Sequence, residues 1–227
     1  RPQYGTGTPA PSVRAREGRG GGGRPRFAVL ALLAHIRRYR HVLRNFVVRD
    51  LKVKYRGTVF GYLWSLLEPL SLVAVYWFVF VVIAERGGPD YPLVVILGVL
   101  PFQFFSAVIS GGTGILVGNA ALIRRVYLPR ELFVVALVLS NLVTLALSLL
   151  VTVPFLIAYD VSPGWRLAYL PVALGLLAAL ALGVSLVLAC VHAMYRDVAY
   201  VVKVVLRLAF YGSPVIYSVG MVPEHIR

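Results

Sequence analysis

The chain has 227 residues, of which 59% are hydrophobic, and its mean hydropathy is +0.80. This composition is too apolar for a soluble domain of that length, so we expect a membrane protein. The formal net charge of +14 is expected from basic residues that face anionic lipid headgroups, and it does not require a nucleic acid as partner.

The first segments of the chain differ sharply in pattern. Residues 1–30 are rich in Gly, Pro and Arg, and such a composition predicts a flexible basic cytoplasmic tail because it buries too little surface to fold. Residues 31–56 place apolar side chains on one helical face and cations on the other, which predicts an amphipathic helix at the membrane interface. Asp50 and Lys54 interrupt the apolar face, so we expect its last turn to meet protein. A basic helix that only anchors the chain is the alternative.

A corner is expected where this helix runs into the first apolar stretch, because two glycines stand between them. The residues that we assign to the corner are Arg49, Asp50, Lys54, Tyr55, Arg56, Gly57 and Gly61.

Five apolar stretches then follow within residues 57–227, and each is long enough for a membrane-spanning helix. They cover about 59–83, 91–117, 132–159, 165–193 and 199–219. The fold class predicted by this pattern is an all-α polytopic membrane protein.

The distribution of cations predicts the orientation of these spans. Of 23 Lys and Arg residues, 14 precede the first span, and six more lie in the connections on the same side of the membrane. The opposite connections and the C-terminal end hold only Arg86, Arg166 and Arg227. Because cytoplasmic loops carry the excess of Lys and Arg, the N-terminus is expected in the cytoplasm.

The connection 119–130 between the second and third spans is too apolar for a solvated loop and too short and charged to cross the membrane. We expect a short helix there that is presented to another protein, and a plain surface loop is the alternative. Its candidate contact residues are Leu122, Ile123, Arg124, Arg125, Tyr127 and Pro129.

A substrate path is suggested by ionisable residues inside apolar stretches, where an unpaired charge is costly. Glu68 is expected to point inward, or alternatively to pair with Arg56. Lys203 and Arg207 share one helical face and could bind an anionic lipid-linked substrate, or simply reach the headgroups. Trp64 is one of several aromatic residues that could stack on sugar rings. The candidate path residues are therefore Trp64, Glu68, Lys203 and Arg207.

Small residues recur at every fourth position in the second and fourth spans, which predicts close helix packing there. They are Ser106, Ser110, Gly114 and Gly118, and then Gly175, Ala179 and Gly183. The run Gly111–Gly114 lacks the Gly-Lys-Ser/Thr of a phosphate loop. The chain shows no catalytic or metal-ligand spacing, so we expect no enzyme activity, metal or cofactor on it.

Three stretches carry a resemblance to a known family. The run Arg49–Leu70 resembles the N-terminal signature of ABC-2 type permeases that export polysaccharides. Leu122–Leu132 is similar to that family's coupling-helix region, and Tyr195–Val198 with Ser213–Tyr217 is similar to the entry and exit of its fifth span. The resemblance extends over nearly everything after about Ala31, although Phe60 stands where relatives usually carry Leu.

The resemblance implies a permease with six spans, so we expect a sixth span beyond Arg227. It implies a dimer of identical permeases in the bacterial inner membrane, driven by two separate ATPase subunits that hold ATP and Mg. The implied cargo is a polyprenyl-pyrophosphate-linked glycan of the O-antigen, teichoic acid or galactan type. The alternatives are a drug or lipid exporter of the same superfamily, a membrane-embedded enzyme, for which clustered acids are lacking, and a structural anchor.

Overall fold

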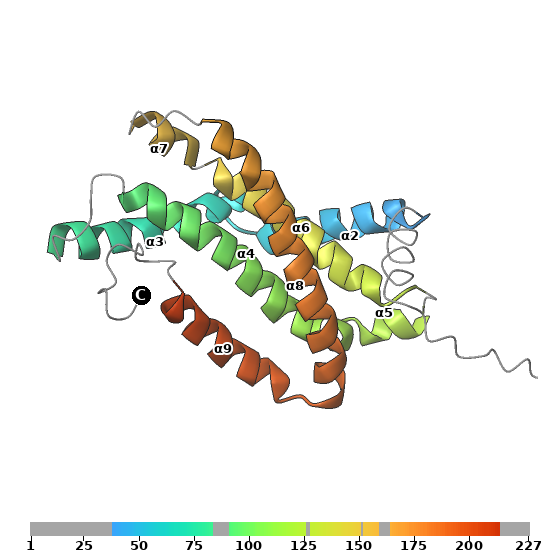
Figure 1. Ribbon diagram of the computed structural model, residues 1–227. Coiled ribbons are helices and arrows are strands. Elements are labelled where there is room, and N and C mark those ends of the chain that lie inside the picture. Colours follow the sequence, from blue (N-terminus) through green and yellow to red (C-terminus); the bar gives the residue numbers. More distant parts are fainter. Residues whose placement is uncertain (1–37, 84–90, 126–127, 151, 159–163, 214–227) are drawn as a thin grey trace, which may run out of the picture.

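The computed structural model describes residues 38–83, 91–125, 128–150, 152–158 and 164–213 (Figure 1). Within these ranges every regular element is a helix, which agrees with the predicted all-α class. The elements are α2 (Arg40–Tyr55), η1 (Gly61–Leu63), α3 (Trp64–Trp77), η2 (Phe78–Ile83), α4 (Tyr91–Gly118), α5 (Ala120–Arg125), α6 (Glu131–Leu149), α7 (Thr152–Ala158), η3 (Trp165–Ala168), α8 (Tyr169–Met194) and α9 (Val198–Gly212). The predicted tail 1–30 lies outside the described residues.

Three described helical segments are long and apolar enough to cross a membrane, namely Leu93–Gly118, Glu131–Pro154 and Tyr169–Met194. They coincide with the predicted second, third and fourth spans. The predicted first span contains α3 followed by a π-helical segment, η2, and the predicted fifth begins with α9. The five-span count and the sixth span therefore stay predictions.

Helix α4 is the central helix of the bundle (Figure 1), and it packs against α3, α6, α8 and α9. Its most deeply buried apolar side chains are Val95, Ile96, Val99, Leu100 and Val108. They form the main core together with Val138 and Leu145 of α6 and Ala181 of α8. The apolar sides of these helices are thus buried chiefly against α4.

Helices α4 and α8 lie close together at Gly112 and Ser185. A Cβ atom added to Gly112 would lie 2.6 Å from the Cβ atom of Ser185. The Ser185 hydroxyl, in a side chain with 0% exposure, donates a hydrogen bond of 3.1 Å to the backbone oxygen of Val108. A small residue and one interhelical hydrogen bond therefore fix how the two helices cross.

This contact corrects the prediction about small residues. On α8 the buried small residues are Ala181, Ser185 and Ala189. They lie on a different side of the helix from the predicted row, which is Gly175, Ala179 and Gly183. A Cβ atom built on any of the four predicted glycines would meet nothing within 4 Å: these are Gly114, Gly118, Gly175 and Gly183. The predicted rows are thus wrong as packing surfaces within the described part of this chain, because neither row faces the α4–α8 crossing.

The crossing predicts opposite effects for two alanine substitutions on α4. Gly112→Ala should lower the free energy of unfolding by about 1–3 kcal/mol, because the new methyl group overlaps Ser185. Gly114→Ala is the matched control, and it should be neutral or stabilising because its methyl group meets no neighbour and alanine favours a helix. Thermal unfolding of both variants in detergent, followed by tryptophan fluorescence, tests this. Equal stability of the two variants would contradict the close contact.

Candidate functional site

Helix α2 is held along the first turns of α6 by apolar contacts. Leu43 of α2 is 3% exposed and belongs to one cluster with Leu132 and Ala136 of α6. Farther along, the ring of Phe46 stacks on that of Phe133, with centroids 5.3 Å apart and an interplanar angle of 26°. The apolar face of the amphipathic helix is therefore covered in part by protein.

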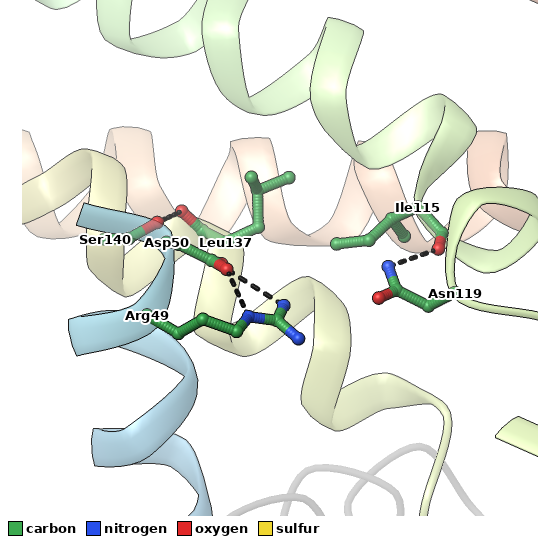
Figure 2. A network of polar contacts seen from close by, with 6 residues as sticks. All are labelled: Arg49, Asp50, Ile115, Asn119, Leu137 and Ser140. Atoms are coloured by element: carbon green, nitrogen blue, oxygen red, sulfur yellow. Dashed lines mark hydrogen bonds and ion pairs between the residues drawn. The ribbon is translucent and has the colours of Figure 1, made fainter. Parts of the chain in front are cut away.

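The guanidinium group of Arg49 lies against the Phe46 ring of this stack. Its guanidinium carbon lies 5.0 Å from the centroid of the Phe46 ring, a distance at which a cation is attracted to the ring face. The same guanidinium donates hydrogen bonds from Nε and Nη2 to Asp50 Oδ1, at 3.1 Å and 2.9 Å. Figure 2 shows Arg49 and Asp50 on α2 beside α6. The carboxylate of Asp50 is thus neutralised locally by its neighbour.

A hollow of about 390 Å³ lies between this stack and the junction of α4 with α5. Its lining residues are Phe46, Arg49, Asp50, Gly111, Gly114, Ile115, Asn119, Phe133, Ala136 and Leu137. Asn119 Nδ2 donates a hydrogen bond of 2.9 Å to the backbone oxygen of Ile115 (Figure 2). The backbone oxygen of Asn119 accepts from the amides of Leu122 and Ile123, both at 3.0 Å. Asn119 therefore joins the end of α4 to the start of α5.

The connection 119–130 contains a short helix, α5, over Ala120–Arg125, as predicted, and its coupling role stays a prediction. Arg124 and Arg125 in its last turn are exposed, and Leu122 and Ile123 are half-buried. Pro129 is half-buried before α6, and Tyr127 lies outside the described residues. The structure thus presents two adjacent cations on a short helix between two long ones, a geometry that can be contacted by another protein.

The predicted corner is formed as expected by two glycines in left-handed backbone conformations. Helix α2 ends at Tyr55, Arg56 is extended, and Gly57 follows with φ of +76°. Gly61, with φ of +48°, opens the 3₁₀ turn that leads into α3. Residues with a Cβ atom are disfavoured in this region, so the two glycines are what allows the chain to turn.

Within the described residues, the last turn of α2 is exposed, so its predicted contact with protein stays a prediction. A second hollow, of about 400 Å³, separates this turn from α4 and α6. Asp50 and Lys54 line it on the α2 side, and Asn141 and Thr144 line it on the α6 side.

The candidate path residues are divided between two helices. Lys203 and Arg207 are both exposed on α9, beside the face that buries Val202 and Leu206. Trp64 at the start of α3 is 46% exposed and makes an edge-to-face contact with the ring of Phe60. The Glu68 side chain lies outside the part of the chain that the structure describes. The structure thus brings the two cations together, but it shows no joint site for the four residues among those described.

Sequence reasoning missed a polar row on α6. Its members are Ser140, Asn141, Thr144 and Ser148, and Gln103 of α4 lies across a hollow from the last three. The sequence does show polar residues three to four positions apart inside an apolar span, and this spacing places them on one face of a helix. The stack of Phe46 on Phe133 was also missed, because it joins elements that are far apart in the sequence.

The sequence profile of the ABC-2 type transporters matches residues 42–227, which is most of the chain. The chain belongs to the ABC-2 type transporter family. The match includes all of α4–α9 and nearly all of α2, so the helices described above are those of this family's membrane domain.

The chain is also similar to curated members of the ABC-2 family. The O-antigen export system permease protein RfbA of Myxococcus xanthus is 29% identical over 86% of this chain and 75% of that protein. A protein of the same name from Klebsiella pneumoniae is 31% identical over 78% of this chain and 68% of its own length. The polysialic acid transport protein KpsM of Escherichia coli is 22% identical over 78% of this chain and 70% of that protein.

The corner generates a prediction that depends on backbone conformation alone. Gly57→Ala should lower the free energy of unfolding by about 1 kcal/mol, because alanine is disfavoured at a φ of +76° and no neighbour lies within 4 Å of the added methyl group. Gly57→Asn should recover much of the loss, since asparagine tolerates this region better. Chemical unfolding of both variants measures the difference. Equal losses for alanine and asparagine would show that the conformation is not the cause.

Proposed function

We propose that this chain is the permease subunit of an ABC exporter that moves a polyprenyl-pyrophosphate-linked polysaccharide across the bacterial inner membrane. The observation that carries the proposal is the similarity of more than three quarters of the chain to proteins named as O-antigen export permeases. A weaker similarity to a polysialic acid transporter extends the cargo class to polysaccharides rather than one polymer. The energy would come from a separate ATPase subunit, and two copies of this chain would enclose the path.

The position of α5 supports a role in contacting that ATPase. The first predicted span begins just after the Gly57 corner, so this corner marks the inner membrane face. Helix α2 packs through Leu43 on Leu132 at the start of α6. Helix α5, which precedes α6, would therefore lie on the same side of the membrane as α2, in the cytoplasm. The N-terminus would lie on the same side.

Helix α9 supplies the face that we assign to the cargo. Tyr200, Lys203, Arg207 and Tyr211 are all exposed, and their spacing places them on one side of the helix. Lys203 Nζ lies 5.9 Å from the centroid of the Tyr200 ring. Fixed cations suit a pyrophosphate, and tyrosine rings offer flat surfaces to sugar rings. Trp64 and Glu68 on α3 would contribute to the same path when two copies assemble.

The proposal is tested by reconstituting the permease with its ATPase in vesicles that contain a labelled polyprenyl-linked glycan. ATP should move the glycan to the leaflet where an added glycosidase can cut it. A hydrophobic dye in matched vesicles serves as the competing cargo. Efflux of the dye with no movement of the glycan would reject the proposal in favour of a drug exporter.

Charge reversal on α5 should uncouple hydrolysis from export. In an Arg124→Glu/Arg125→Glu variant, ATP-dependent glycan export should decrease at least tenfold while ATP hydrolysis in the same vesicles persists, because the reversed charge on α5 disrupts its contact with the ATPase. Arg196→Glu is the matched control, since Arg196 is an exposed arginine in a cytoplasmic connection but not on α5. Export and hydrolysis are measured in the same vesicles. Tight coupling in the α5 variant would exclude this helix as the contact.

Neutralising the cations of α9 should weaken recognition of the cargo. Lys203→Gln/Arg207→Gln should abolish most of the stimulation of ATP hydrolysis by the lipid-linked glycan, and basal hydrolysis should persist. Arg196→Gln removes a nearby exposed cation and should leave the stimulation intact. Hydrolysis is titrated with the glycan lipid for each variant. Unchanged stimulation in the double variant would mean that these residues only reach headgroups.

A further inference from the structure

An open groove of about 940 Å³ runs along the side of α2 that faces away from α6. Lys52 lines this groove, and it stands nine positions after Leu43, which packs on α6. Nine positions correspond to two and a half turns, so the two side chains leave the helix on opposite sides. Gly61, at the start of η1, lines the groove from beyond the corner. The groove therefore leads from the uncovered face of α2 to the start of the first predicted span.

The groove carries positive charge that the described part of the chain does not neutralise. Its lining includes no acid and four cations, namely Arg44, Arg49, Lys52 and Arg56. Asp50 is the only acid in residues 18–67, and its carboxylate accepts the hydrogen bonds of Arg49. Within the described residues, Lys52 and Arg56 form no hydrogen bond or ion pair. A counter-charge for these two cations has to come from outside the described chain.

Lys52 and Arg56 are placed so that both can contact one phosphate group. They are four positions apart, which is about 6 Å along the helix axis, and both line the same groove. The ammonium and guanidinium groups present several N–H donors, and phosphate oxygens accept such charge-assisted hydrogen bonds. Arg44 lies about 12 Å farther from the corner than Lys52. The compact anion site is therefore the corner end of the groove.

Exposed apolar side chains beside this pair favour a lipid over a soluble anion. Val53 is exposed and lines the groove between the two cations. Val59 and Phe60, directly before Gly61, are 95% and 50% exposed and open the first predicted span. A phospholipid joins a charged headgroup to acyl chains, so it can cover both kinds of surface at once. The acidic surface of a soluble protein would neutralise the cations but would not match the apolar patch beside them.

We propose that the corner end of this groove binds an anionic phospholipid from the leaflet next to α2. Lys52 and Arg56 contact the phosphate group, and Val53 and Phe60 contact the acyl chains. Clusters of cations on an amphipathic helix suit such headgroups. The site is separate from the α9 face assigned to the cargo, because α2 packs on α6, whereas α9 packs on α4 and α8. The proposal requires only that the chain lies in a membrane, so it stands or fails independently of glycan export.

Native mass spectrometry of the full chain in detergent, titrated in parallel with dioleoylphosphatidylglycerol and dioleoylphosphatidylcholine, tests this site. The unchanged chain should bind the phosphatidylglycerol about tenfold more tightly, because the choline ammonium of the other lipid opposes the cation pair. Lys52→Gln/Arg56→Gln should raise the dissociation constant for phosphatidylglycerol about tenfold by removing the charge-assisted contacts. Arg38→Gln/Arg40→Gln is the matched control, because it removes the same charge from exposed residues near the start of α2 that do not line the groove. Circular dichroism confirms that each variant remains helical.

Four results would overturn the proposal. Equal binding of the two lipids by the unchanged chain would remove the selectivity for negative headgroups. Equal weakening by the two double variants would indicate general surface attraction. An unchanged lipid affinity in the Lys52/Arg56 variant would exclude the groove, and loss of the ATPase from the same purified variant would assign it to that partner instead. Displacement of the lipid by sodium phosphate at an equal concentration would assign the site to free phosphate. Loss of phosphatidylglycerol binding in the groove variant alone would establish the lipid site.

Discussion

The close approach of α4 to α8 at Gly112 and Ser185 is the contact on which the placement of the other helices depends. In a lipid environment, apolar surfaces gain little by leaving the acyl chains, so small residues and interhelical hydrogen bonds decide how helices associate. Residues of α8 next to this crossing contact the other helices. Leu182 packs against both the main core and the cluster that holds α2, and Val184 and Leu188 pack against the cluster of α9. One crossing thus sets the geometry of both sides of the bundle.

The elements that sequence alone predicted well are those specified by local chemistry. Long apolar stretches gave α4, α6 and α8, because the length of a span is fixed by the thickness of the membrane. The corner was predictable at Gly57 and Gly61, since a left-handed residue at a helix end is most often glycine. The short helix α5 followed from a segment that suited neither a loop nor a span. In each case the information lies within one segment.

The features that sequence did not predict depend on which helical faces meet. Small residues occur on several faces of α4 and α8, and nothing local distinguishes Gly112 from Gly114. What distinguishes them is the partner across the crossing, because Gly112 faces Ser185 of α8 whereas Gly114 faces no neighbour within 4 Å. The same reason applies to Gln103 and Asn141, which lie on different spans and share a cavity only after α4 and α6 have packed. A residue's type was visible in the sequence, but its partner was not.

Different sides of α4 serve different neighbours. Ile109 packs in one cluster with Val202 and Leu206 of α9, whereas Gln103 lines the cavity between α4 and α6. The two residues are six positions apart, which places them on different sides of a helix with 3.6 residues per turn. A single central helix can therefore hold a packed helix on one side and a polar cavity on another.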